Sequence, residues 1–151
     1  MYGALPWIVS LTVIILDQLV KSVVSGNLYL GQSLPVIKNI FHITLVHNTG
    51  VAFGLFKNLS SFFILVSAAV ILYILKDLLI NHRCYSLRKK IAFSLVLGGA
   101  CGNLIDRFHL GYIVDFLDFR IWPVFNIADS AITIGIFLLA IELFFARSLN
   151  Y

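Results

Sequence analysis

The sequence predicts an all-α membrane protein with four transmembrane helices and a small extracytoplasmic β-hairpin, or β-cradle, between the first and second helices. Of its 151 residues, 60% are hydrophobic and only 12% are charged, and the mean hydropathy is +0.98. Globular domains are about half apolar and a quarter charged. A membrane-crossing helix needs roughly 20 residues, and four apolar segments divide the chain. We therefore expect residues 1–151 to form a single integral membrane domain.

The first predicted span covers about residues 5–24. Trp7 lies near one interface, and Asp17 and Lys21 lie near the other. These two charged residues are four apart, so they share one face of a helix and can neutralise each other. The segment lacks a basic leader and a small-residue cleavage site, so we interpret it as a retained span and not as a cleaved signal peptide.

A β-hairpin is predicted between the first two spans. Two apolar runs, 34–37 and 41–46, flank Lys38 and Asn39, and apolar and polar residues alternate through the second run, as in a half-buried strand. Gly50 and Gly54 then interrupt the chain before the second span. We hypothesise that the connection 25–57 closes as a lid over the polar residues described below.

The remaining spans are predicted at about residues 58–75, 91–106 and 126–146. The second ends where charged residues begin, and the third begins after Lys89-Lys90. The third also contains Gly98 and Gly102 at GxxxG spacing, which lets a neighbouring helix backbone approach closely. We expect this approach to press the face that carries Asn103 against the neighbouring helix.

The basic residues predict the orientation in the membrane. Short cytoplasmic loops collect Lys and Arg, and the connection between the second and third spans holds five: Lys76, Arg83, Arg88, Lys89 and Lys90. This places both termini in the cytoplasm and the connections 25–57 and 106–125 on the extracytoplasmic side. The basic cluster has no interleaved aromatic residues, so we interpret the net charge of +4 as a topology signal and expect no nucleic-acid partner.

Polar residues gather at one end of the predicted helices, on the extracytoplasmic side. They are Asp17, Lys21, Asn48, Gly50, Asn103, Asp106, Arg107, Asn126 and Asp129. Ionisable residues at a membrane are costly and are therefore candidates for function. The strongest candidates are Asp115, in the connection after the third span, and Asp129, which opens the last apolar run.

Two carboxylates that share one site of low dielectric constant tend to hold a single proton. Amide hydrolysis can use that state, because the ionised acid deprotonates a water molecule while the protonated acid hydrogen-bonds the carbonyl oxygen. Asp115 and Asp129 are the predicted pair. For either one alone, a structural hydrogen bond or ion pair would be as good an explanation, but the nearby Asn103, Arg107 and Asn126 favour function.

Several other residues are weaker candidates. Asp118 could replace Asp115, but it stands beside Arg120, so we expect it to be a solvated surface charge. We expect Asp106 to form a local ion pair or a helix-end contact that orients Arg107, and Glu142 to be structural. The four histidines lack ligand spacing, so no metal or cofactor is predicted. Ser130 and Cys84 are poorly placed as nucleophiles, since Ser130 diverges from Asp129 on a helix and Cys84 is in a cytoplasmic loop.

The sequence resembles the bacterial lipoprotein signal peptidases (signal peptidase II), which are membrane aspartic proteases. The resemblance covers essentially the whole chain, and its motifs occur in the family's order. They are Asp17-Gln18-Leu19-Val20-Lys21, Asn48-Thr49-Gly50-Val51-Ala52-Phe53-Gly54, Gly98-Gly99-Ala100-Cys101-Gly102-Asn103-Leu104-Ile105-Asp106-Arg107, Val114-Asp115-Phe116 and Phe125-Asn126-Ile127-Ala128-Asp129-Ser130.

The resemblance implies an endopeptidase of the bacterial cytoplasmic (inner) membrane. Such an enzyme cuts the signal peptide from a prolipoprotein just before a cysteine that already carries diacylglyceryl. The resemblance assigns Asp115 and Asp129 as the catalytic dyad, a lining role to Asn48, Asn103, Arg107 and Asn126, and support to Asp17 and Lys21. We expect the protein to work as a monomer among membrane lipids, with its active site near the extracytoplasmic face.

Two alternatives come from other classes. A small proton-coupled transporter would use intramembrane acids as a relay, but these should be spaced through the membrane depth, whereas all except Glu142 lie near one end. A structural membrane subunit would leave the polar cluster without a role. We therefore favour the peptidase.

Overall fold

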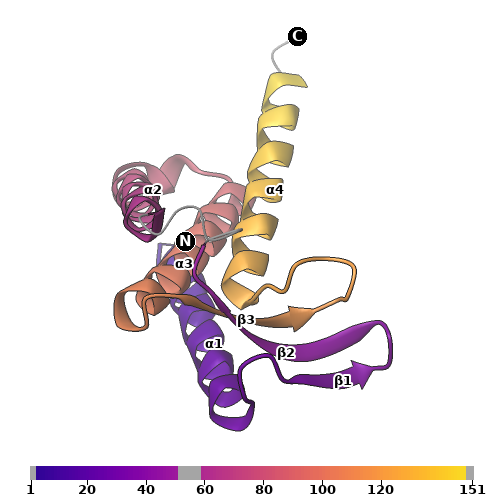
Figure 1. The fold of residues 1–151 in the computed structure, drawn as a ribbon. Coiled ribbons are helices and arrows are strands. Elements are labelled where there is room, and N and C mark those ends of the chain that lie inside the picture. Colours follow the sequence, from indigo (N-terminus) through magenta and orange to yellow (C-terminus); the bar gives the residue numbers. More distant parts are fainter. Residues whose placement is uncertain (1–2, 51–58, 149–151) are drawn as a thin grey trace.

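The computed structural model describes residues 3–50 and 59–148. Its helices are α1 (Leu5–Asn27), α2 (Leu59–Asn81), α3 (Leu87–His109) and α4 (Ile127–Ser148), and a short 3₁₀ helix, η1 (His82–Cys84), follows α2. The strands are β1 (Ser33–Ile37), β2 (Phe41–Asn48) and β3 (Ile113–Asp118). The sheet lies at one end of the helices, beside the start of α4, and the last turns of α4 lie at the other end (Figure 1). The predicted fold class is confirmed.

Each of the four long helices contains a segment that is long and apolar enough to cross a membrane. Large apolar side chains cover their outer faces, for example Leu11 and Leu19 on α1, Leu65 on α2 and Phe137 on α4, each more than half exposed. A soluble protein would not expose so much apolar surface, whereas lipid covers it without cost. We therefore treat the chain as a multi-pass membrane protein.

The helix α3 is the centre of the bundle and packs against each of the other three helices. Glycines make these contacts close. A Cβ atom on Gly98 would lie 2.7 Å from the carbonyl oxygen of Ser10 on α1, and one on Gly135 of α4 would lie 2.7 Å from that of Ala92 on α3. Small residues at these positions therefore let the helix backbones touch.

The helices are longer than the spans that the sequence predicts. α2 continues past position 75 to Asn81, and α3 begins at Leu87 and not at position 91. A helix need not end where the hydrocarbon ends. Asn81 donates a hydrogen bond to Asp77 one turn earlier, and the Ser86 hydroxyl caps α3 by accepting from the Lys89 N–H group at 3.1 Å. The predicted start of the second span at position 58, and Gly54, lie outside the described residues.

The predicted hairpin is present as β1 and β2, with Asn39 in the left-handed conformation at its turn. The sequence did not predict β3, which pairs antiparallel with β2 and completes a sheet of order β1-β2-β3. Residues on both faces of β3 are buried, so it lacks the alternation that marks a half-exposed strand. The pairing places Asp115 opposite Val46 on β2.

Replacing Gly98 with alanine should lower the thermal stability of the protein in detergent. Alanine is the better helix former by about 1 kcal/mol, but the close contact with Ser10 should cost more, since overpacking costs about 1–3 kcal/mol. Gly26→Ala is the matched control, because nothing lies within 4 Å of a Cβ atom there. A Gly98→Ala protein as stable as Gly26→Ala would contradict the close packing.

Candidate active site

A buried lysine lies at the centre of the polar end of the bundle. The Lys21 ammonium contacts Asp17 Oδ2 at 2.8 Å and Asp106 Oδ2 at 2.7 Å, and it donates a hydrogen bond to Asn103 Oδ1 at 3.1 Å. The three charged side chains are each at most 4% exposed. All three donors of the ammonium group are therefore used. We call Asp17, Lys21, Asn103 and Asp106 the Lys21 cluster.

The two carboxylates of this cluster also hold the elements that carry Asp115 and Asp129. Asp17 Oδ1 accepts the backbone N–H of Ala128 at 2.9 Å, which satisfies one of the free donors at the start of α4. Asp106 Oδ2 accepts the backbone N–H of Val114 at 3.1 Å, directly before Asp115. The Lys21 cluster thus fixes both the first turn of α4 and the middle of β3.

Asn126 connects the two aspartates. Its side-chain oxygen caps α4 by accepting the N–H of Asp129 at 2.8 Å, as an N-cap residue does. Its side-chain nitrogen donates to Asp115 Oδ1 at 2.7 Å and to Asn103 Oδ1 at 3.1 Å. Asn103 in turn donates to Asp129 Oδ1 at 2.7 Å. The structure therefore brings Asp115 and Asp129 into one hydrogen-bond network.

Asn48 approaches Asp115 from the other side. Its side-chain nitrogen donates to Asp115 Oδ2 at 2.9 Å, so an amide holds each oxygen of that carboxylate. Its side-chain oxygen accepts the N–H of Gly50, whose positive φ of 74° suits glycine. This short turn explains the Asn48-x-Gly50 spacing in the sequence.

The environment of Asp115 favours protonation. The side chain is 1% exposed, and burial, reinforced by the negative charge of Asp129, raises the Asp115 pKa to about 6 although Asn48 and Asn126 hydrogen-bond the ionised form. A carboxyl group with this pKa can exchange a proton near neutral pH, which suits acid-base catalysis.

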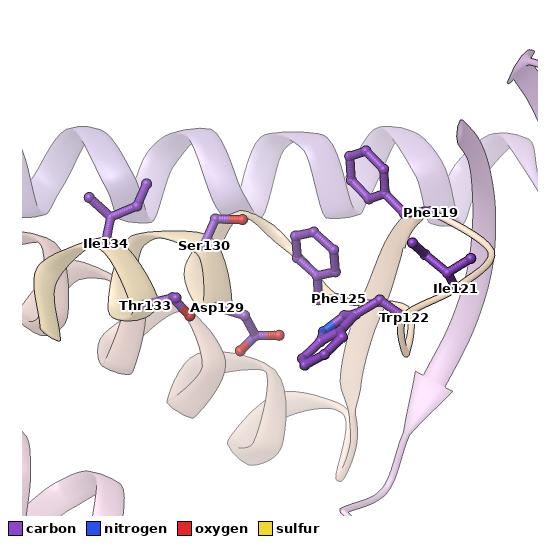
Figure 2. Close-up of a pocket in the computed structure, with 8 residues that line it drawn as sticks. All are labelled: Phe119, Ile121, Trp122, Phe125, Asp129, Ser130, Thr133 and Ile134. Atoms are coloured by element: carbon purple, nitrogen blue, oxygen red, sulfur yellow. The ribbon is translucent and has the colours of Figure 1, made fainter. Parts of the chain in front are cut away.

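Two pockets reach Asp129 from different sides of α4. One, of about 370 Å³, lies between α2, α3 and α4 and is lined by Asn48, Asn103 and Arg107 together with apolar residues. The other, of about 530 Å³, is almost wholly apolar. Figure 2 shows Asp129, Ser130, Thr133 and Ile134 of α4 facing Phe119, Ile121, Trp122 and Phe125, which follow β3. The Asp129 carboxylate therefore lies at the wall of an apolar pocket.

Arg107 belongs to the first of these pockets. It is partly buried, and its guanidinium lies 5.5 Å from the centre of the Phe63 ring on α2, a distance typical of a cation–π contact. Its positive charge also lies close enough to Asp129 for the two charges to attract each other.

Two sequence expectations were wrong. Asp118 is not a solvated surface charge: it is 4% exposed, accepts the Thr44 hydroxyl at 2.7 Å and pairs with Arg120 at 3.0 Å. The Thr44 hydrogen bond is the largest cause that holds the Asp118 pKa below its usual value. Asp106 is paired with Lys21 and not with Arg107. Thr44 on β2 and Lys21 on α1 lie far from these aspartates in the chain, so no local sequence pattern indicates the two contacts.

Gln18 is a site residue that the sequence analysis did not assign. Its side-chain nitrogen donates to Asp106 Oδ1 at 2.9 Å and to the Gly102 carbonyl at 3.1 Å, so it closes the Lys21 cluster from the α1 side. In the sequence, only its position between Asp17 and Lys21 could have indicated that Gln18 belongs to the site. No group of His, Cys, Asp or Glu able to hold a metal ion occurs among the described residues.

Comparison with known proteins decides the family. The family model described as "Signal peptidase (SPase) II" matches residues 9–145. The chain belongs to the signal peptidase II family. It is therefore a peptidase, with four helices able to span a membrane.

Two relatives named lipoprotein signal peptidase show how far the similarity extends. The one from Halothermothrix orenii is 46% identical over 141 residues, which cover 91% of this chain and 93% of the relative. The one from Moorella thermoacetica is 46% identical over 136 residues, 90% of each. A solved bacterial membrane enzyme superposes with a TM-score of 0.88 at 32% identity, covering 98% of this chain and 92% of that enzyme. The match to the signal peptidase II family thus extends over sequence and fold.

Replacing Lys21 with methionine should destabilise the protein strongly. The substitution leaves Asp17 and Asp106 buried without their cation, and removal of one partner of a buried ion pair typically costs about 3–5 kcal/mol. Thermal unfolding in detergent measures the effect. Lys38→Met, at the exposed turn of the hairpin, is the control and should change little. Equal unfolding temperatures for the two variants would refute the structural role of the Lys21 cluster.

Proposed function

We propose that this protein removes signal peptides from diacylglyceryl-modified prolipoproteins by hydrolysing the peptide bond just before the lipidated cysteine. The observation that carries the proposal is the network in which Asn126 and Asn103 join Asp115 to Asp129 beside two pockets. The relatives named lipoprotein signal peptidase support the substrate class. The apolar pocket beside Asp129 suits a substrate that carries acyl chains.

In the proposed reaction the two aspartates share one proton. The ionised carboxylate accepts a proton from a water molecule as the water oxygen bonds to the scissile carbonyl carbon. The protonated carboxyl group donates to the carbonyl oxygen, where negative charge develops. The tetrahedral intermediate then collapses: one of its hydroxyl groups gives its proton to the ionised carboxylate, the C–N bond breaks, and the leaving nitrogen receives a proton from the protonated carboxyl group, so that the dyad again holds one proton. The raised pKa of Asp115 supports a role for this residue in holding the shared proton.

The surrounding amides and Arg107 would position the substrate. Asn103 holds one oxygen of Asp129, which lines both pockets, and amides hold both oxygens of Asp115. Asn48 and Arg107 line the pocket between α2, α3 and α4. In our proposal they orient the peptide backbone around the scissile bond, as fixed donors do in other hydrolases. The proposed reaction needs no cofactor.

The proposed location follows from the charge distribution. The basic connection between α2 and α3 lies at the end of the bundle away from the sheet, and it favours a cytoplasmic position for that end and for both termini. The dyad would then face the outer side of the bacterial inner membrane, where an anchored precursor presents its cleavage site. We propose that a monomer suffices, since both aspartates come from one chain.

Replacing Asp115 or Asp129 with asparagine should abolish cleavage of a diacylglyceryl-modified prolipoprotein peptide by the purified enzyme. Asparagine has nearly the same size but cannot deprotonate water, so we expect losses of at least about 10³-fold with little change in thermal stability. Asp118→Asn, on the same strand, is the matched control and should retain cleavage. Near-normal turnover by either dyad variant would exclude this mechanism.

Replacing Asn48 with alanine should move the pH dependence of cleavage to higher pH. The Asn48 amide stabilises ionised Asp115, so its removal should raise the Asp115 pKa above about 6. A carboxyl group with a higher pKa keeps its proton to higher pH, and the limb of the pH–rate profile that Asp115 controls should shift in that direction. An unchanged profile with reduced rate would indicate that Asn48 only binds substrate.

A further inference from the structure

A further pocket lies at the opposite end of the bundle from Asp115 and Asp129. Its volume is about 570 Å³. The C-terminal part of α2, the connection after η1, the first turns of α3 and the last part of α4 form its walls. It is lined by Tyr73, Cys84, Tyr85, Ser86, Lys89, Phe93, Leu139, Glu142 and Leu143. None of these residues contributes to the proposed peptidase chemistry.

The charges around this pocket are unbalanced. Of the two nearby carboxylates, Glu142 accepts the Ser86 hydroxyl and contacts Arg88 at 3.5 Å, whereas Asp77 accepts the Tyr85 hydroxyl and interacts with Lys89 only through the longer-range attraction of opposite charges. Lys89 forms no ion pair with any described residue. Its ammonium group lies 3.7 Å above the centre of the Tyr85 ring, at the pocket wall. An unpaired cation therefore faces the pocket.

The sequence adds further positive charge beside Lys89. Arg88 and Lys90 adjoin it in the first turns of α3, and Arg83 precedes them in η1. Positive charge is disfavoured at the N-terminal end of a helix, where the backbone dipole already presents partial positive charge. A bound anion would offset this arrangement. The orientation of the protein in the membrane explains why basic residues gather at this end of the bundle, but it does not explain why Lys89 lines a pocket.

The remaining walls of the pocket are apolar and open to lipid. Tyr73 and Leu143 are 65% and 68% exposed, and the adjacent Phe144 is 73% exposed, on helices able to span a membrane. A molecule that fills the pocket must therefore carry a negatively charged group for Lys89 and hydrocarbon chains for the apolar walls. A soluble anion satisfies only the first condition.

We propose that this pocket binds an anionic phospholipid. The phosphate group lies beside Lys89, and the acyl chains extend along Tyr73, Leu139 and Leu143. Basic pockets between transmembrane helices are known to hold anionic head groups by this combination of charge and apolar contact.

Lipid titration of the purified full-length protein in detergent, followed by native mass spectrometry, tests the proposal. Phosphatidylglycerol should bind more tightly than phosphatidylcholine. Lys89→Gln should weaken phosphatidylglycerol binding about fivefold, the factor that corresponds to about 1 kcal/mol per basic residue near an anionic lipid. Leu143→Trp should also weaken binding, because it narrows the pocket without changing the charge, and its exposed position makes the substitution compatible with folding.

Lys76→Gln is the matched control. Like Lys89→Gln, it removes one positive charge at this end of the bundle. Lys76 is exposed on α2 and does not line the pocket, so the substitution should leave lipid binding unchanged. Equal losses in Lys76→Gln and Lys89→Gln would show diffuse attraction to the basic surface and overturn the proposal. So would equal binding of the two lipids, full binding by Leu143→Trp, or displacement of the lipid by millimolar inorganic phosphate. Cleavage activity is measured separately, so a failed lipid site leaves the peptidase proposal intact.

Discussion

The ammonium group of Lys21 lies between carboxylates from two different helices, in a region that excludes water almost completely. Asp106 accepts the backbone N–H of Val114 on β3 with the same oxygen that contacts Lys21, and Asp17 accepts the N–H of Ala128 in the first turn of α4 with its other oxygen. Removal of the cation would leave two buried negative charges together, and both elements would lose their anchor. The geometry of the dyad therefore depends on a residue that touches neither aspartate of the pair. The same cation orients the Asn103 amide, because its contact with the side-chain oxygen leaves the nitrogen to face Asp129.

This arrangement requires close helix packing. Asp17 Oδ2 would lie 2.7 Å from a Cβ atom on Gly102, so the carboxylate occupies space that only glycine leaves free. Gly98 brings α1 against α3 one turn earlier. The run of small residues on α3 thus serves the polar network as well as the apolar core. A bundle with larger side chains here would keep the charges apart and expose them to lipid.

The sequence was sufficient to predict the helices, the hairpin and the convergence of polar residues, because these follow from hydropathy and from spacing along a helix. The Asp17–Lys21 ion pair was predictable for the same reason. Other features depend on contacts between distant residues. β3 is buried on both faces and so lacks a strand period, and the partners of Asp106 and Asp118 lie 85 and 74 positions away. Asp115 and Asp129 were predicted as a pair from their place at the apolar run and from their polar neighbours, and the family resemblance added their assignment as a catalytic dyad. The structure supplies the Asn126–Asn103 connection that no spacing rule contains.

Asp115 acquires its surroundings late in biosynthesis. Its hydrogen-bond partners are Asn48 on β2 and Asn126 at the start of α4, and the nearby negative charge of Asp129 also belongs to α4. A nascent chain with three helices inserted carries Asp115 and Asn48 but lacks the last two groups. In the proposed mechanism, the site is therefore complete only when the final helix docks.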